Sequence, residues 1–262
     1  MLSCCQTDNL PQEVCTMTIN RPALKLQARD TIRQSQQAPV KILYGSAVFV
    51  ALNALISFLS ARLTGVSYAA MNRYMRYVED GSWDRALSYL GTIAPSPGAR
   101  FLDLALNLVT IIVGVGFTVF LFNHVRKTEP AYGNLLDGFG PYLRVAVLEL
   151  VVGVFVALWS LLLVVPGIIA LYRYRFAPYI LLDHPEMSIM DCIRESKRMT
   201  KGYKSQLFTL DLSFLGWAIL ALIPYAGYLV EVFLLPYFGI TQILCYDQVR
   251  QAEQAYRFDP YA

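Results

Sequence analysis

Long uncharged apolar runs dominate the pattern of hydrophobic and polar positions along the chain. The runs cover residues 42–61, 104–122, 150–172, 212–230 and 232–246. Several of them approach the roughly 20 residues that an α-helix needs to cross the hydrocarbon core of a membrane. The pattern therefore predicts an all-α protein built from transmembrane helices.

Six spans account for these runs, with short interfacial helices between some of them. We place the spans at about 42–62, 101–124, 144–165, 167–183, 206–224 and 227–245. The third and fourth must be separate, because one helix over residues 142–183 would be about 63 Å long, twice the thickness of the core. Pro166-Gly167 is the expected turn, since proline lacks an amide donor and glycine tolerates a reversal.

The composition agrees with a polytopic membrane protein. Hydrophobic residues make up 56% of the chain and charged residues only 16%, and the mean hydropathy is +0.44, which excludes an ordinary soluble domain. A formal charge of +3 without dense basic runs argues against nucleic acid as a partner. The five cysteines lack a C-x-x-C spacing, so neither a zinc site nor a disulfide framework is predicted.

The distribution of Lys and Arg orients the bundle. Short cytoplasmic loops hold an excess of these residues, and an arrangement with both termini in the cytoplasm puts fifteen of the 22 on the inner side. A five-span arrangement would instead place the densest cluster of Lys and Arg, at residues 194–204, on the outer side of the membrane. We therefore expect six spans with both termini cytoplasmic.

The spans divide the chain into four regions. Residues 1–41 form a cytoplasmic, partly disordered arm, whose first sixteen residues are either a disordered extension or precede the true start. Residues 42–124 form a hairpin with an extracytoplasmic loop at 63–100. Residues 125–249 form a membrane domain of two hairpins, and 250–262 a cytoplasmic tail. We expect no cleavable signal peptide, because the first residues are polar.

Helical spacing of apolar residues also occurs outside the spans. Residues 23–34 of the arm, and residues 68–78 and 83–89 of the outer loop, are expected to form short helices lying on the membrane surface. The outer pair is rich in tyrosine and is either a connector in the interface or an extracytoplasmic contact surface.

A basic helix is predicted after the fourth span. Ser188 and Asp191 form a capping-box-like start, and Gly202 marks the end. Its basic face consists of Arg194, Lys197, Arg198 and Lys201. The helix either anchors the chain at the interface or binds anionic headgroups or a protein partner on the cytoplasmic face.

The second half of the chain resembles a known family. The residues that carry the resemblance are Pro166-Gly167-Ile168, Ala177-Pro178-Tyr179, Ser196-Lys197 with Lys201-Gly202, and Leu212-Ser213-Phe214 with Gly216-Trp217. From about residue 137 to 249 the chain is similar to the bacterial integral-membrane family of domain of unknown function 975. The resemblance implies a multi-pass protein of the bacterial cytoplasmic membrane without an established activity.

The two hairpins of this region align with one another at an offset of 58 residues. Trp159 then matches Trp217, Pro166 matches Pro224 and Pro178 matches Pro236. The match indicates either parallel repeats or convergence, because prolines and aromatic residues are common at the ends of helical hairpins. We regard Pro166, Gly167, Pro178, Pro224 and Pro236 as candidate turns and hinges.

Five ionisable residues lie inside the predicted spans and form a candidate charge network. They are Glu149, Arg173, Arg175, Asp211 and Glu231. Such residues are costly in a bilayer and usually face the bundle interior. We predict one contact between Arg173 and Glu231 and another between Arg175 and either Glu149 or Asp211. The contacts serve either helix packing or a solute or proton path.

No soluble-enzyme signature occurs in the sequence. We therefore expect no enzyme, no catalytic residue, no cofactor and no metal site, and leave the oligomeric state open. Two functions remain. The first is a non-enzymatic envelope module that binds lipid or a partner. The second is a small transporter whose gate lies between the two hairpin repeats.

Overall fold

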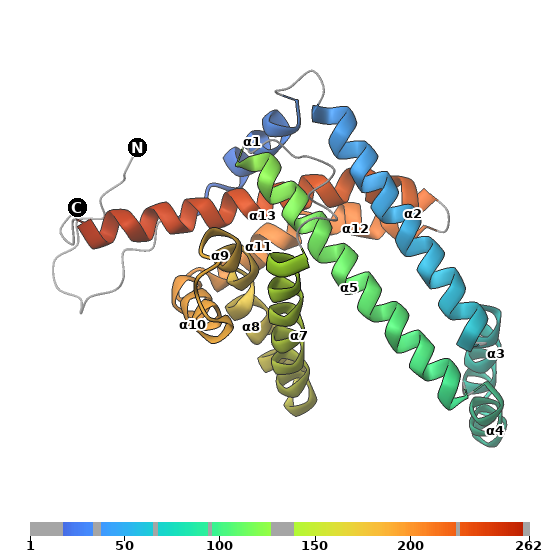
Figure 1. The fold of residues 1–262 in the computed structure, drawn as a ribbon. Coiled ribbons are helices and arrows are strands. Elements are labelled where there is room, and N and C mark those ends of the chain that lie inside the picture. The colour runs from blue at the N-terminus through green and yellow to red at the C-terminus, as the bar shows by residue number, and fades with distance from the viewer. Residues whose placement is uncertain are drawn as a thin grey trace. The chain divides into compact units, whose positions relative to one another are not determined.

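The protein is helical throughout the part of the chain that the structure describes (Figure 1). This computed structural model describes residues 18–33, 38–64, 68–93, 96–126, 139–223 and 226–258, and no strand occurs among them. The predicted all-α class is therefore confirmed. The first sixteen residues and Pro224 lie outside the described ranges.

The helices follow the predicted elements closely in the first half of the chain and less closely in the second. In chain order they are α1 (Arg21–Arg33), α2 (Ala38–Thr64), α3 (Tyr68–Glu79), α4 (Trp83–Ile93), α5 (Pro97–Val125), α7 (Phe139–Leu162), α8 (Val164–Tyr174), α9 (Ala177–Asp183), α10 (Ile189–Met199), α11 (Lys204–Leu212), α12 (Leu215–Ala221) and α13 (Ala226–Phe258).

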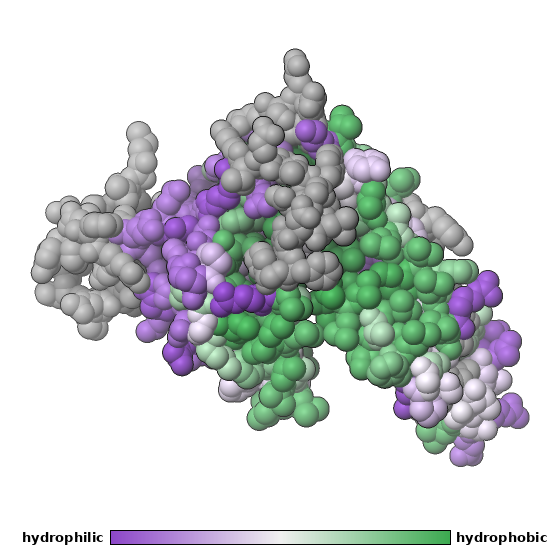
Figure 2. All heavy atoms as spheres, in the orientation of Figure 1, coloured by the Kyte–Doolittle hydropathy of each residue, from purple (hydrophilic) through white to green (hydrophobic). Residues whose placement is uncertain are grey.

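Four helices of the described ranges are long and apolar enough to cross a membrane. They are Val40–Thr64, Pro97–Val125, Leu143–Leu162 and Gly227–Gln254. Large apolar side chains on these helices are exposed, among them Leu161 at 86% and Phe101 at 74%. Figure 2 shows this hydrophobic surface over α2 and α5. So much exposed apolar area is typical of a protein whose solvent is lipid.

The predicted fourth and fifth spans are not continuous helices. The fourth is divided into α8 and α9 near Arg175, and the fifth into α11 and α12 near Ser213. Four of the six predicted spans are thus continuous helices in the described ranges, and the fourth and fifth spans stay a prediction. Pro178 lies in the first turn of α9, where its missing amide is tolerated but where it prevents a regular helix from continuing through from α8.

The turn between the third and fourth predicted spans lies earlier than expected. Leu163 is the extended residue between α7 and α8, with φ −161° and ψ 144°, whereas Pro166 and Gly167 lie in the first turn of α8. Gly167 serves close packing instead. A Cβ atom there would lie 2.9 Å from Ser160 Cα, so only glycine lets α8 approach α7 this closely.

The described helices belong to two compact units, each built from separate stretches of sequence. One contains residues 1–28, 148–216 and 241–262, and the other contains 29–147 and 217–240. In the first unit α10 packs on α8 and α9, and α11 packs on α8. In the second unit α2 packs on α5, and α3 on α4. The predicted division at residue 125 stays a prediction.

Aromatic packing joins α2 and α5 in the second unit. Phe49 stacks on Phe117 with 4.8 Å between ring centroids. Gly45 lies against Phe120, so that a Cβ atom there would come within 3.2 Å of the ring. The two helices therefore approach at a small residue on one and at aromatic residues on the other.

Pro236 lies inside the continuous helix α13, unlike its predicted repeat partner Pro178 at the start of α9. A proline leaves the carbonyl four residues earlier without its helical donor. Here that carbonyl belongs to Val232, and Ser46 Oγ on α2 lies 2.8 Å from it and 3.0 Å from the Leu43 oxygen. Ser46 is fully buried. A distant hydroxyl thus lets α13 pass through Pro236 without a break.

This arrangement predicts the effect of removing the hydroxyl. Ser46→Ala is expected to lower the free energy of unfolding by about 1–3 kcal/mol, because the Val232 carbonyl loses a buried donor. In a Pro236→Ala background the new amide at residue 236 supplies that donor, so the same substitution should have little effect. Unfolding of the purified protein in mixed micelles titrated with a denaturing detergent measures both values.

The control is Ser57→Ala on the same helix, whose side chain is exposed. It should leave the unfolding free energy nearly unchanged in both backgrounds. Equal losses from Ser46→Ala with and without Pro236 would contradict the assigned role of the hydroxyl.

Candidate functional site

An ion pair connects the two interrupted segments of the first unit. Arg175 follows the last residue of α8, and Asp211 lies in the last turn of α11. The guanidinium donates from Nη1 to Asp211 Oδ2 at 2.7 Å and from Nη2 to Oδ1 at 2.8 Å. The side chains of Arg175 and Asp211 are only 16% and 27% exposed. The predicted Arg175–Asp211 contact is therefore present, with bidentate geometry.

Two side chains that the sequence did not single out complete this pair. Tyr172 Oη donates to Asp211 Oδ2 at 2.9 Å, and Gln242 Nε2 donates to Oδ1 at 3.1 Å. The Arg175 guanidinium carbon also lies 5.4 Å from the centroid of the Tyr172 ring. Each carboxylate oxygen of Asp211 thus accepts two hydrogen bonds. We call these four residues the Arg175–Asp211 cluster.

The other predicted charge contacts have different outcomes. Glu149 was the alternative predicted partner of Arg175. It lies on α7 in the same unit as the cluster, and within the described ranges the bidentate carboxylate partner of Arg175 is Asp211. Arg173 and Glu231 belong to different units. Their contact therefore stays a prediction.

A buried serine holds the interruption between α8 and α9. Ser196 Oγ on α10 accepts from the Phe176 amide at 3.1 Å and donates to the Arg173 carbonyl at 2.9 Å. Both Ser196 and Phe176 are fully buried. The ends of interrupted helices leave amides and carbonyls without intrahelical partners. The Ser196 hydroxyl thus satisfies one such amide, that of Phe176, and one such carbonyl, that of Arg173, on either side of Arg175.

A lysine from the N-terminal helix holds the interruption between α11 and α12. Lys25 Nζ donates to the Ser213 carbonyl at 3.0 Å and lies 4.2 Å from the centroid of the Phe214 ring. Burial, and secondly the positive charge of Arg21, lower the pKa of Lys25. Before this helix, the Ile19 amide donates to Gln206 Oε1 of α11 at 2.6 Å. The start of the described chain is therefore docked onto this segment.

The predicted basic helix is α10, and its ends match the expected signals. The Ser188 hydroxyl accepts from the Asp191 amide at 3.2 Å, and Gly202 adopts a positive φ of 90° after the helix. Cys192, Ile193 and Met199 on one side are buried. The four predicted cations are all exposed on the other side, and Figure 2 shows hydrophilic surface in this region.

Carboxylates pair with two of the four cations of α10. Arg194 Nη1 lies 2.7 Å from Asp191 Oδ1. Arg198 donates to Glu195 within α10 and to Glu253 of α13 at 2.9 Å, and the bond to Glu195 is the main reason that its pKa is raised. For Lys197 and Lys201 the described residues provide no carboxylate within ion-pair distance. These two lysines carry most of the uncompensated charge.

Helix α13 is tied to this region by a second polar contact. Asp183 at the end of α9 accepts from Tyr246 Oη at 2.9 Å and pairs with Arg250. Within the described ranges no group of three or more His, Cys, Asp or Glu side chains is placed to hold a metal ion. The Asp183 contacts therefore join the end of α9 to α13.

A known protein family matches the part of the chain that contains the Arg175–Asp211 cluster and α10. Residues 161–253 match the family model described as Protein of unknown function (DUF975). The chain resembles the DUF975 family over this stretch. The resemblance expected from the sequence is confirmed, although the matched residues begin later than residue 137. No curated protein and no solved structure matches the chain.

The motifs that carried the resemblance to DUF975 lie where the helices are interrupted or closely packed. Gly167 packs α8 on α7, Pro178 begins α9, Ser196 holds the first interruption, Ser213 lies at the second and Gly202 ends the basic helix. These motif residues thus have structural roles at helix ends and helix contacts of the first unit. Each of them lies inside the matched range.

Tyr172 and Gln242 were missed because each is an ordinary polar residue in an apolar segment. Their positions in the sequence could have indicated that they belong to the cluster. Tyr172 precedes Arg175 by three residues, which puts both on one face of α8. Gln242 interrupts an otherwise apolar stretch of α13, where an amide needs an internal partner.

Proposed function

We propose that this protein is a non-enzymatic module of the bacterial cytoplasmic membrane that binds anionic lipid headgroups through α10. In this proposal both termini are cytoplasmic. The interrupted segments α8–α9 and α11–α12 also cross the bilayer, since residues 164–183 would extend about 30 Å as helices.

The observation that carries the proposal is the division of α10 into two faces. Its apolar residues are buried against α8 and α9, while its four cations are exposed. The pKa of Lys204 is lowered by burial and then by the positive charges of Arg173 and Lys197. Positive charge is therefore concentrated around the start of α11 as well. Basic residues at a membrane surface favour anionic headgroups by about 1 kcal/mol each.

Lipid-dependent stability tests this proposal. Phosphatidylglycerol added to the protein in a neutral detergent should raise the midpoint of thermal unfolding more than phosphatidylcholine does, because binding to the folded state stabilises it. Lys197→Gln and Lys201→Gln should each weaken the apparent affinity for phosphatidylglycerol about fivefold. Added salt should reduce the effect.

Arg76→Gln with Arg85→Gln, both exposed on the predicted outer helices, is the matched control and should leave the affinity unchanged. Equal stabilisation by the two lipids would reject lipid binding at α10. The basic face would then be assigned to a protein partner instead.

Transport is the second candidate function, and one observation favours it. Transporters often place their sites at interrupted helices near the middle of the membrane, and the Arg175–Asp211 cluster lies at two such interruptions. Against a solute path, Asp211 is already saturated with protein donors. Labelling of single cysteines at residues 171–176 and 210–214 with a membrane-impermeant reagent distinguishes the two, since only a water-filled path would let it react.

A further inference from the structure

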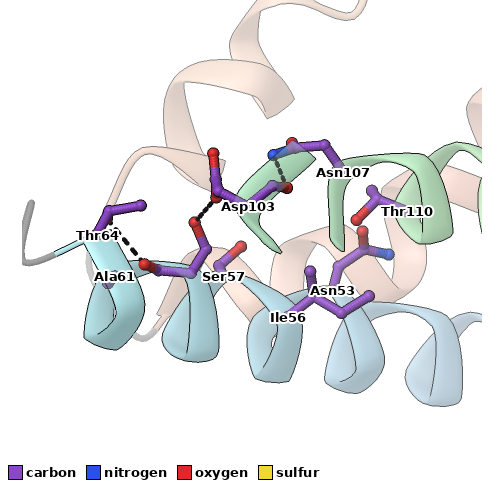
Figure 3. A pocket seen from close by; sticks show the side chains of 9 residues that line it. Asn53, Ile56, Ser57, Ala61, Thr64, Asp103, Asn107 and Thr110 are labelled. Carbon is purple, nitrogen blue, oxygen red and sulfur yellow. Dashed lines mark hydrogen bonds between the residues drawn. The ribbon is translucent and has the colours of Figure 1, made fainter. Parts of the chain in front are cut away.

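A polar cleft lies between α2 and α5, in the second unit and away from the residues considered so far. It has a volume of about 480 Å³, within the usual range for small-ligand pockets. Its polar lining comes from both helices: Asn53, Ser57, Ser60, Thr64, Asp103, Asn107 and Thr110. Figure 3 shows Asn53 of α2 and Thr110 of α5 turned toward each other across it. Both helices are candidate membrane spans, where such polar residues are uncommon and indicate function.

Three of the four hydroxyl groups that line this cleft, all except that of Ser57, already donate within the protein. Thr64 donates to the Ser60 carbonyl at 2.8 Å, Thr110 donates to the Leu106 carbonyl at 3.2 Å, and Ser60 Oγ donates to Asp103 Oδ1. What these side chains leave for a ligand is oxygen lone pairs.

The two amides of the cleft are held in the same way. Asn53 Nδ2 donates to the Phe49 carbonyl at 2.9 Å, and Asn107 Nδ2 donates to the Asp103 carbonyl at 2.8 Å. Each bond returns to the helix that carries the amide. Each bond uses one of the two N–H groups of the amide and leaves the amide oxygen available to accept, so the lining holds more acceptor sites than unused donors.

Asp103 gives the cleft a negative charge. The lining contains no Lys, Arg or His, and within the described ranges the polar partner of Asp103 is Ser60 alone. A carboxylate in a membrane span normally has a cationic partner, because an unpaired charge there is costly. The one charge of the lining is negative and its acceptor sites outnumber its unused donors, so a ligand that provides positive charge and N–H donors complements the cleft.

We propose that this cleft binds a primary ammonium group. An –NH₃⁺ group has three N–H donors and one positive charge, which complement the amide oxygens and the carboxylate. The volume of about 480 Å³ leaves room for the molecule that carries the group. That molecule is either an aminophospholipid headgroup or a free amine. The proposal does not depend on lipid binding at α10.

The test compares two phospholipids of equal net charge and different hydrogen-bonding capacity, and adds a free amine. The full-length protein in a neutral detergent is titrated with phosphatidylethanolamine, phosphatidylcholine and free ethanolamine, and bound molecules are counted by native mass spectrometry. Phosphatidylethanolamine should bind about tenfold or more tightly than phosphatidylcholine, whose trimethylammonium group has no N–H. Binding of the lipid without ethanolamine identifies a headgroup site, whereas binding of ethanolamine alone identifies a site for a soluble amine.

Asp103→Asn is the decisive variant, because it removes the charge and keeps the shape of the side chain. It should weaken binding of the ammonium ligand by about tenfold or more. Asp84→Asn on α4, where the side chain is exposed, is the matched control and should bind normally. If Asp103→Asn does not fold, Thr110→Val, which places a methyl group in the cleft, provides the same test. Equal binding of the two phospholipids together with no binding of ethanolamine, or full binding of the ammonium ligand by a folded Asp103→Asn protein, would overturn the proposal.

Discussion

Replacing Asp211 with alanine is expected to lower the free energy of unfolding by about 3–5 kcal/mol. The substitution removes the bidentate partner of Arg175, whose side chain is only 16% exposed. It also leaves Tyr172 Oη and Gln242 Nε2 without the acceptor that they share. A charge that has lost its partner inside the protein destabilises far more than the pair had stabilised. Unfolding in mixed micelles, followed by far-UV circular dichroism, measures the loss.

Two comparisons make this expectation specific. Arg194→Ala breaks an ion pair of the same 2.7 Å length, but between exposed side chains on α10, and should lower the unfolding free energy by less than about 1 kcal/mol. Arg175→Met combined with Asp211→Leu removes both charges and should recover most of the stability that Asp211→Ala loses. An Asp211→Ala variant that loses no more unfolding free energy than Arg194→Ala would contradict the assigned role of the cluster.

Replacing Ser196 with alanine is expected to have the second largest effect, a loss of about 2–5 kcal/mol in the free energy of unfolding. One hydroxyl serves the Phe176 amide and the Arg173 carbonyl, and both lose their partner in the variant. Thr200 Oγ1 lies 3.4 Å from the same carbonyl and replaces only part of one bond. The substitution leaves two groups unsatisfied at the interruption that positions Arg175.

Ser205→Ala is the matched control, since this serine is exposed on α11 and should change the unfolding free energy little. A double-mutant cycle between Ser196→Ala and Asp211→Ala measures coupling. We expect a coupling energy of about 0.5–3 kcal/mol, because the interruption places Arg175 opposite Asp211. Independent effects would show that Ser196 stabilises α10 alone and does not position the arginine.

Several elements could be predicted because their signals are local. Helices α3 and α4 follow from helical spacing of apolar residues on either side of Gly81, which adopts a positive φ of 68°. Helix α10 follows from Ser188 and Asp191 at its start and Gly202 after its end. Each signal lies within one or two turns of the residue that it controls, so no knowledge of the remaining chain was needed.

The interruptions in the predicted fourth and fifth spans could not be predicted in this way. Both segments have the apolar composition of a continuous span. The groups that stabilise the interruptions come from elsewhere, Ser196 from α10 and Lys25 from α1. The same holds for Pro236, which would be expected to bend or break α13. Ser46 on α2 supplies a donor to the carbonyl that the proline leaves free.

The sequence by itself determined that this is a helical membrane protein with a basic helix after its fourth apolar segment. It also determined which charged residues need internal partners, because apolar runs, caps and charge placement act over a few residues. Only the tertiary structure decided which partners meet. In the structure Arg175 pairs with Asp211 rather than Glu149, and two of the predicted spans are interrupted helices. Asp103 of α5 lies with residues of α2 in a polar cleft. The physical reason is that backbone groups and charges in a membrane protein must be satisfied inside it, and residues far apart in the chain satisfy them.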